Sequence, residues 1–220
     1  TTGAVDVEDN LDLFEKLGLL EGHLLIGKAL LDAKMQEAAL PHFGHPVREL
    51  YDYLKPIFAE RKHPEFEADL TDLEKRAKTE PNAPSTATAF NAVLVKVDAL
   101  RSTIPPSLMG SPDFITTGIG MMVEAAAGDL GESLDKGKIV NILEYHDAMG
   151  FAQYADNAVK KYGSVLGKRS PAIAKETAFT LTAFPALAAP AKPTHSVASV
   201  RSAADRVKAM AAKQNTPSSG

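Results

Sequence analysis

Apolar residues recur every three or four positions through most of the first 163 residues. This spacing places them on one face of each of a series of helices and predicts that these faces meet in a common core. Ala and Leu dominate the apolar residues, and aromatic residues make up only 6% of the chain. Such a composition favours helices over sheets. The sequence therefore predicts an all-α fold, a helical bundle of about six helices.

The expected helices are separated by prolines, glycines or short charged turns. Their approximate ranges are 6–33, 36–43, 46–61, 65–78, 86–102, 112–136 and 138–162. After Gly163 the helical pattern weakens, and the chain is interrupted by Pro171, Pro185, Pro190 and Pro193. We therefore expect a long irregular C-terminal tail, with room for a short helix over 171–183, that ends in a short amphipathic helix over 195–213.

Charge is distributed unevenly along the chain. Residues 1–159 carry a net charge of −12, and residues 160–220 carry a net charge of +8. An imbalance of this size predicts that the basic segment docks on an acidic surface. That surface belongs either to the body of the same chain or to a protein partner. We divide the chain accordingly into an acidic helical bundle, residues 1–163, and a basic Ala/Pro-rich docking tail, residues 164–220.

Several classes of function are disfavoured by what the sequence lacks. The absence of Cys removes disulfides, thiolate nucleophiles, zinc ribbons and iron–sulfur clusters. The sequence contains no G-x-S-x-G, P-loop, G-x-G-x-x-G or H-E-x-x-H motif, so we expect no enzyme activity. The acidic body is unlike a nucleic-acid reader, so no nucleic-acid partner is expected. No apolar run approaches 18 residues, so no transmembrane segment is expected.

The first residue of the sequence is Thr1 rather than Met. We interpret this start as that of a processed chain, the mature form of an exported protein. The expected location is therefore periplasmic, or otherwise exported, after removal of a signal peptide.

Two histidines occur in the same local pattern, E-x-H-x-x-x-G. His23 lies in the first expected helix and His146 in the last helix of the body, each with apolar neighbours on its face. Glu and His two positions apart point to nearly opposite sides of a helix, so they do not share an ion. A metal ion or a haem would instead have to be bound jointly by His23 and His146. A glycine one turn after each histidine leaves space beside the ring for a flat ligand. The alternative is that both are core histidines, hydrogen-bonded to neighbouring helices.

A second candidate site surrounds Pro46. His45 and Glu49 are four positions apart and share a face if a helix begins near this proline, a spacing that suits a transition metal. His42 can join them from the preceding turn. The alternative is a simple helix junction, with Pro46 in the first turn of a helix. Glu124, in an apolar stretch, is either a further ligand beside His146 or an exposed carboxylate.

Three segments carry resemblances to known families. EGHLLIGKALL (21–31), HPVRELY (45–51) and EYHDAMGF (144–151) resemble an uncharacterised family of exported bacterial helical proteins. The His45–Glu49 region is similar to imelysin-type periplasmic bundles, a resemblance that implies an association with iron, although the G-x-H-x-x-E order of that family is not met. Residues 22–43 resemble one tetratricopeptide-type hairpin, and a single unit implies no solenoid.

These observations leave two main hypotheses for function. In the first, the chain is a non-enzymatic exported helical protein that binds a transition metal or haem through inward-facing histidines. In the second, it is an accessory or scaffold subunit of a larger complex and docks through its basic tail, residues 164–220. A third hypothesis, a carrier of hydrophobic ligands, relies on the Gly/Ala-rich stretch 118–131.

Overall fold

The computed structural model describes residues 6–212. Its elements, in chain order, are α1 (Val7–Asp32), α2 (Gln36–His45), the π-helical turn η1 (Pro46–Leu50), α3 (Tyr51–Glu60), α4 (Glu67–Thr79), α5 (Pro84–Arg101), α6 (Pro106–Met109), α7 (Pro112–Glu132), β1 (Leu134–Asp135), β2 (Lys138–Ile139), α8 (Ile142–Lys161), α9 (Gly163–Leu166), the 3-10 turn η2 (Gly167–Arg169), α10 (Ser170–Leu181) and α11 (Val197–Ala212). The two short strands form an antiparallel hairpin between α7 and α8. The all-α expectation is confirmed, and the described helices are more numerous than the six expected.

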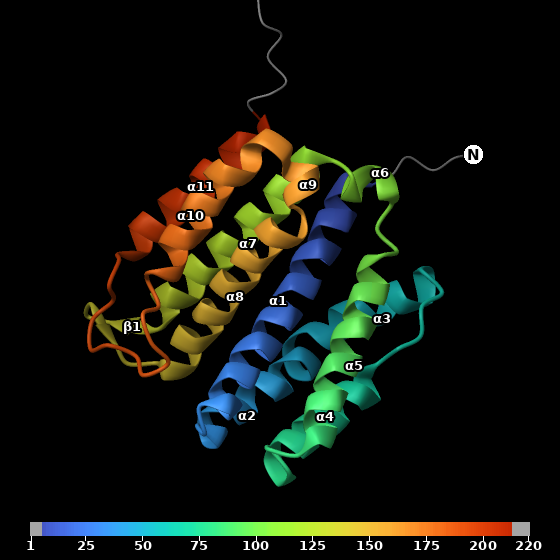
Figure 1. Ribbon diagram of the computed structural model, residues 1–220, viewed down its shortest axis with the longest axis vertical. Helices are drawn as coiled ribbons and strands as arrows, with labels where there is room; N and C mark the ends of the chain where they lie inside the picture. Colours follow the sequence, from blue (N-terminus) through green and yellow to red (C-terminus); the bar gives the residue numbers. More distant parts are fainter. Residues whose placement is uncertain (1–5, 213–220) are drawn as a thin grey trace, which may run out of the picture.

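The long helices lie side by side around one apolar core (Figure 1). On one side, α7, α8, α10 and α11 form a four-helix bundle, in which α7 packs against both α8 and α11. Helix α1 packs against α8 and α7 and separates this bundle from α2 to α5. Helix α2 packs against α1 and α4, so the two halves of the chain meet along α1.

The C-terminal segment is more regular than its prolines predict. Residues expected to form a long irregular tail contain α10 and α11, and the irregular stretch is confined to 182–196. Pro171 lies in the first turn of α10, where a missing N–H costs nothing, while the other three prolines all fall in the connection. Helix α11 agrees with the expected amphipathic helix over 195–213 for the residues that the structure describes. It buries Val200, Ala203, Ala204 and Val207.

Basic residues of this segment form ion pairs with acidic residues of the same chain. Lys208 Nζ lies 2.5 Å from Glu124, and a guanidinium nitrogen of Arg169 lies 2.5 Å from Asp113. These contacts support the interpretation in which the basic segment docks on its own acidic body. The division of the chain into two parts at residue 163 stays a prediction, and so does docking on another protein.

Helices α1 and α8 approach closely where two glycines face each other. A Cβ atom added to Gly150 would collide with the backbone carbonyl of Gly22. His23 directly follows Gly22 on α1, and Asp147 lies one turn before Gly150 on α8. The contact between the two glycines therefore brings His23 and Asp147 close together from the two helices. The close approach of α1 and α8 sets the position of the site described below.

The expected break between the second and third helices is a π-helical turn rather than an interruption. Pro46 has a helical backbone conformation, but it lacks an N–H group and cannot continue the regular hydrogen-bond ladder. The π-helical turn η1 accommodates it and leads directly into α3. Such turns occur frequently at functional sites, and this one carries Glu49 next to His42 and His45 of α2.

The glycine contact predicts a specific sensitivity to substitution. Gly150→Ala forces α1 and α8 apart, so we expect the free energy of unfolding to fall by about 1–3 kcal/mol. Urea denaturation followed by circular dichroism, with a chelator present, measures this change. Gly128→Ala is the matched control, because a Cβ at Gly128 meets nothing within 4 Å. Alanine is the better helix former, so the control should gain up to about 1 kcal/mol. Equal effects of the two substitutions would contradict the close approach.

Candidate metal centre

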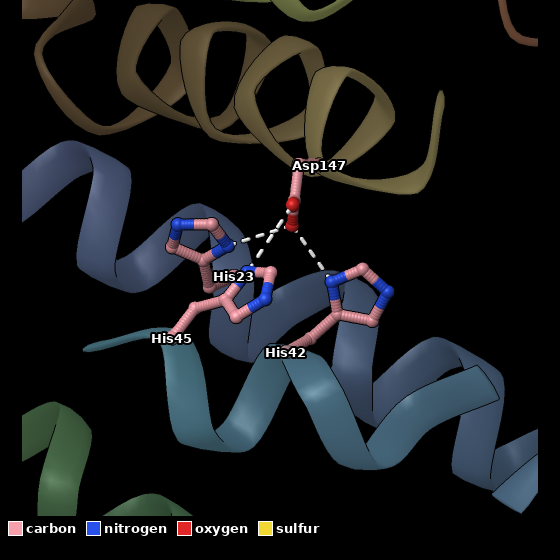
Figure 2. A group of neighbouring side chains, drawn as sticks. All are labelled: His23, His42, His45 and Asp147. Carbon is pink, nitrogen blue, oxygen red and sulfur yellow. Dashed lines mark hydrogen bonds and ion pairs between the residues drawn. The ribbon is translucent and has the colours of Figure 1, made fainter. Parts of the chain in front are cut away.

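Four buried side chains from three helices converge on one point (Figure 2). His23 comes from α1, His42 and His45 come from α2, and Asp147 comes from α8. The two histidines of α2 are three positions apart, so they share a face of that helix. Asp147 reaches them from the side where Gly150 packs on α1. The contact between α1 and α8 thus brings together residues that are more than a hundred positions apart.

Asp147 is the centre of this cluster. Its Oδ1 atom accepts hydrogen bonds from Nδ1 of His23 and Nδ1 of His42, both at 2.7 Å. Nδ1 of His45 lies 3.2 Å from Oδ2. The exposed fractions are 3% for His23, 0% for His42, 8% for His45 and 2% for Asp147. The carboxylate is therefore removed from water and is compensated by imidazole groups.

The charges of these groups follow from burial and from their mutual contacts. Burial raises the pKa of Asp147, but hydrogen bonds from His23 and His42 and the adjacent ring of His45 outweigh burial and hold that pKa well below its usual range. Burial also lowers the pKa of His42, which favours its neutral form. For His45, burial acts in the same direction, but Asp147 and Glu49 outweigh it and raise the pKa. The ionised carboxylate of Asp147 and the neutral ring of His42 are in the protonation states that a metal ion requires, whereas the ring of His45 would have to release a proton on metal binding.

Two polar atoms of the cluster lack hydrogen-bond partners among the described residues. They are Nδ1 of His45 and Nε2 of His42, and both are fully buried. Unpaired buried polar atoms are costly, so each calls for an explanation. One donor atom from each of the four residues lies within 4.8 Å of all the others. Three imidazoles and one carboxylate form a donor set typical of transition metals, so the residues fit a metal ion.

Glu49 lies at the edge of the cluster. Its carboxylate oxygens are 3.7 Å from Nδ1 of His45 and 3.9 Å from Nε2 of His23. The side chain is half-exposed and lines a cavity of about 320 Å³ together with His23 and Asp147. The structure thus brings His42 and His45 together with His23 and places Glu49 beside His45 and His23, while metal binding by these residues stays a prediction.

His146 lies beside the cluster and points elsewhere. Its ring centroid is 5.6 Å from that of His42, but its Nε2 donates a hydrogen bond to the carbonyl oxygen of Leu187 at 2.8 Å. We expected a glycine one turn after each histidine to leave space for a flat ligand, but other parts of the chain fill the space beside both glycines. Gly27 faces the ring of Phe43, and Gly150 faces the backbone of α1. The structure brings His23 together with the histidines of α2 and not with His146.

Glu124 does not reach the cluster. Its carboxylate is half-exposed on α7 and forms the ion pair with Lys208 of α11 described above. The expected costly burial does not arise, because the α7–α11 packing leaves the carboxylate at the surface.

Asp147 is the residue that sequence analysis missed. It stands directly after His146 in the EYHDAMGF segment, where the histidine was taken as the candidate ligand and the aspartate was not. The position of Asp147 on its helix could have identified it as a buried residue. Leu143, Asp147 and Gly150 lie at i, i+4 and i+7, so a charged residue interrupts a face that is otherwise apolar and small. A carboxylate in that position must be paired.

Comparison with known protein families gives one match. Residues 105–217 match the family described as iron permease-associated 4-helix bundle domain. The match covers just over half of the chain and includes α7, α8, α10 and α11 as well as Asp147. The three histidines of the cluster lie before it. Searches among curated proteins and among solved structures find no match. Within residues 6–212, every helix is too short or too polar to cross a membrane.

The role of Asp147 in the metal-free protein can be measured. In Asp147→Asn, the side chain loses its charge and one accepting oxygen, and three buried histidines are left poorly paired. We expect the free energy of unfolding at pH 7 to fall by about 3 kcal/mol, since one partner of a buried charged group is removed. Urea denaturation in the presence of a chelator provides the measurement. Asp52→Asn, at an almost fully exposed carboxylate, should change nothing measurable. A loss no larger than that of this control would show that Asp147 does not hold the histidines.

Proposed function

The chain belongs to the family of iron permease-associated four-helix bundle domains, and from this premise we propose that it binds iron at the cluster of His23, His42, His45 and Asp147. The observation that carries the proposal is the convergence of these four buried side chains, one of them in the matched region, on a single point. Imidazole and carboxylate are the ligands of non-haem iron sites. The chain contains no Cys, so the thiolate ligands that select softer metals are absent.

The family's association with an iron permease supports a role in iron supply. We propose a non-enzymatic, exported protein that holds iron outside the cytoplasm and associates with a permease. The metal is cargo in this account. The half-exposed Glu49 and the cavity beside it provide a path between solvent and the buried donors.

Iron binding is tested on the purified full chain after treatment with a chelator. Anaerobic titration with Fe²⁺, followed by calorimetry, should detect stoichiometric binding. His42→Ala removes a fully buried donor and should weaken the binding by more than about tenfold. His63→Ala is the matched control, because His63 contacts the carbonyl oxygen of Pro64 outside the cluster. Binding of Zn²⁺ alone, or equal affinity in both variants, would contradict the proposal.

A second prediction concerns the permease partner. Lys175 on α10 and Arg201 on α11 are exposed basic residues of the segment predicted to dock. If this surface reaches the permease, the double charge reversal Lys175→Glu with Arg201→Glu should weaken association with permease-containing vesicles at least several-fold. Iron affinity of the soluble chain should not change, because both residues lie on helices that carry no cluster residue. Unchanged association in vesicle co-sedimentation would exclude this surface as the docking site.

A further inference from the structure

A second group of acidic side chains lines the cavity beside the histidine cluster. Asp129 and Glu132 stand in the last turn of α7, and Glu144 stands in the first turn of α8. One carboxylate oxygen from each lies within 4.8 Å of the other two. The tight β1–β2 hairpin explains this proximity, since it returns the chain from the end of α7 to the start of α8. Glu144 is three positions before Asp147, so both project from one face of α8.

This acidic group is electrostatically costly. Asp129 is partly buried near the carboxylates of Asp147, Glu144, Glu132 and Glu49, and burial together with these like charges raises the pKa of its carboxyl group. Asp129 and Glu132 also lie at the C-terminal end of α7, where the helix dipole disfavours negative charge. Within residues 6–212, no Lys or Arg forms an ion pair with any carboxylate of the group. Three carboxylates therefore gather at this point without a Lys or Arg counter-ion in the described part of the chain.

The acidic group and the histidine cluster share one cavity. Its lining includes Asp129, Glu132 and Glu144 together with His23, Glu49 and Asp147. His23 is almost completely buried, and its Nδ1 is bound to Asp147. Its Nε2 points away from Asp147 (Figure 2), 3.9 Å from Glu49, and has no hydrogen-bond partner among the described residues. His23 thus lines the cavity with an almost completely buried ring whose Nε2 atom has no hydrogen bond among the described residues.

We propose that this cavity holds a second metal ion, bound by Asp129, Glu132 and Glu144. The inference rests on the proposed iron site, because the histidine cluster provides the first ion. The all-oxygen donor set suits a hard cation, such as iron or manganese, and differs from the imidazole-rich set next to it. Glu49 contacts the histidine cluster and lines the same cavity as the three carboxylates.

The arrangement of helices supports a two-ion centre. Helices α7 and α8 are antiparallel neighbours, and each contributes a pair of carboxylates spaced at i, i+3: Asp129 with Glu132, and Glu144 with Asp147. Helical bundles that bind two metal ions do so with carboxylates and histidines that project inward from facing helices. The histidines of the neighbouring cluster come from α1 and α2, and α1 lines the cavity through Leu19 and His23.

The number of bound ions tests the inference. Chelator-treated full-length protein is titrated with Fe²⁺ under anaerobic conditions, and bound iron is counted by elemental analysis after desalting. We expect two ions for the unmodified chain and one for Glu144→Gln, which retains size and removes charge. Glu124→Gln is the matched control, because Glu124 is also a carboxylate of the α7–α8 pair but lies outside the cavity. It should still bind two ions. The melting temperature of each metal-free variant verifies that it is folded.

The outcomes separate this inference from the proposed function. One ion in the unmodified chain, with unchanged affinity in Glu144→Gln, overturns the second site and leaves the histidine site intact. No bound ion overturns both. Loss of one ion in His42→Ala as well as in Glu144→Gln, with both ions retained in Glu124→Gln, supports two separate positions. Asp129→Asn provides a second variant for the acidic position and should also reduce the count from two ions to one.

Discussion

A buried carboxylate is stable only if other groups compensate its charge, and Asp147 is such a carboxylate. Nδ1 atoms of His23 and His42 donate hydrogen bonds to one of its oxygens, and His45 lies beside the other. Because these residues come from α1, α2 and α8, one side chain connects the four-helix bundle to the N-terminal helices. The same contacts keep the carboxylate ionised and orient three imidazoles toward a common point. Stability and the proposed metal binding thus depend on one interaction.

Close helix packing makes that interaction geometrically available. The facing glycines of α1 and α8 let the two backbones touch. The π-helical turn at Pro46 places Glu49 beside His45 of α2 and at the edge of the cavity. The short hairpin brings the end of α7 to the start of α8 and gathers three further carboxylates. The site is therefore assembled from local features that each have an ordinary structural explanation.

Much of this architecture is predictable from the sequence, and the reasons for the exceptions are physical. Helical spacing predicts the all-α fold, and the spacing of His45 and Glu49 predicts their proximity. His23 lies beside the histidines of α2 rather than beside His146, because α1 and α2 are neighbours. Helical periodicity predicts which face of a helix is buried, but not which helix packs against it. Asp147 was missed although its helical face offered a signal. The prolines of the C-terminal segment suggested irregularity, but Pro171 begins a helix and the others occupy one connection.

The central claim is that a metal ion lies among His23, His42, His45 and Asp147. Diffraction from crystals of the iron-loaded protein, recorded on both sides of the iron absorption edge, tests it most directly. The account predicts an anomalous difference peak within bonding distance of three imidazole nitrogens and one oxygen of Asp147. A map in which the four side chains keep their direct hydrogen bonds and the iron signal lies elsewhere, or is absent, would contradict it.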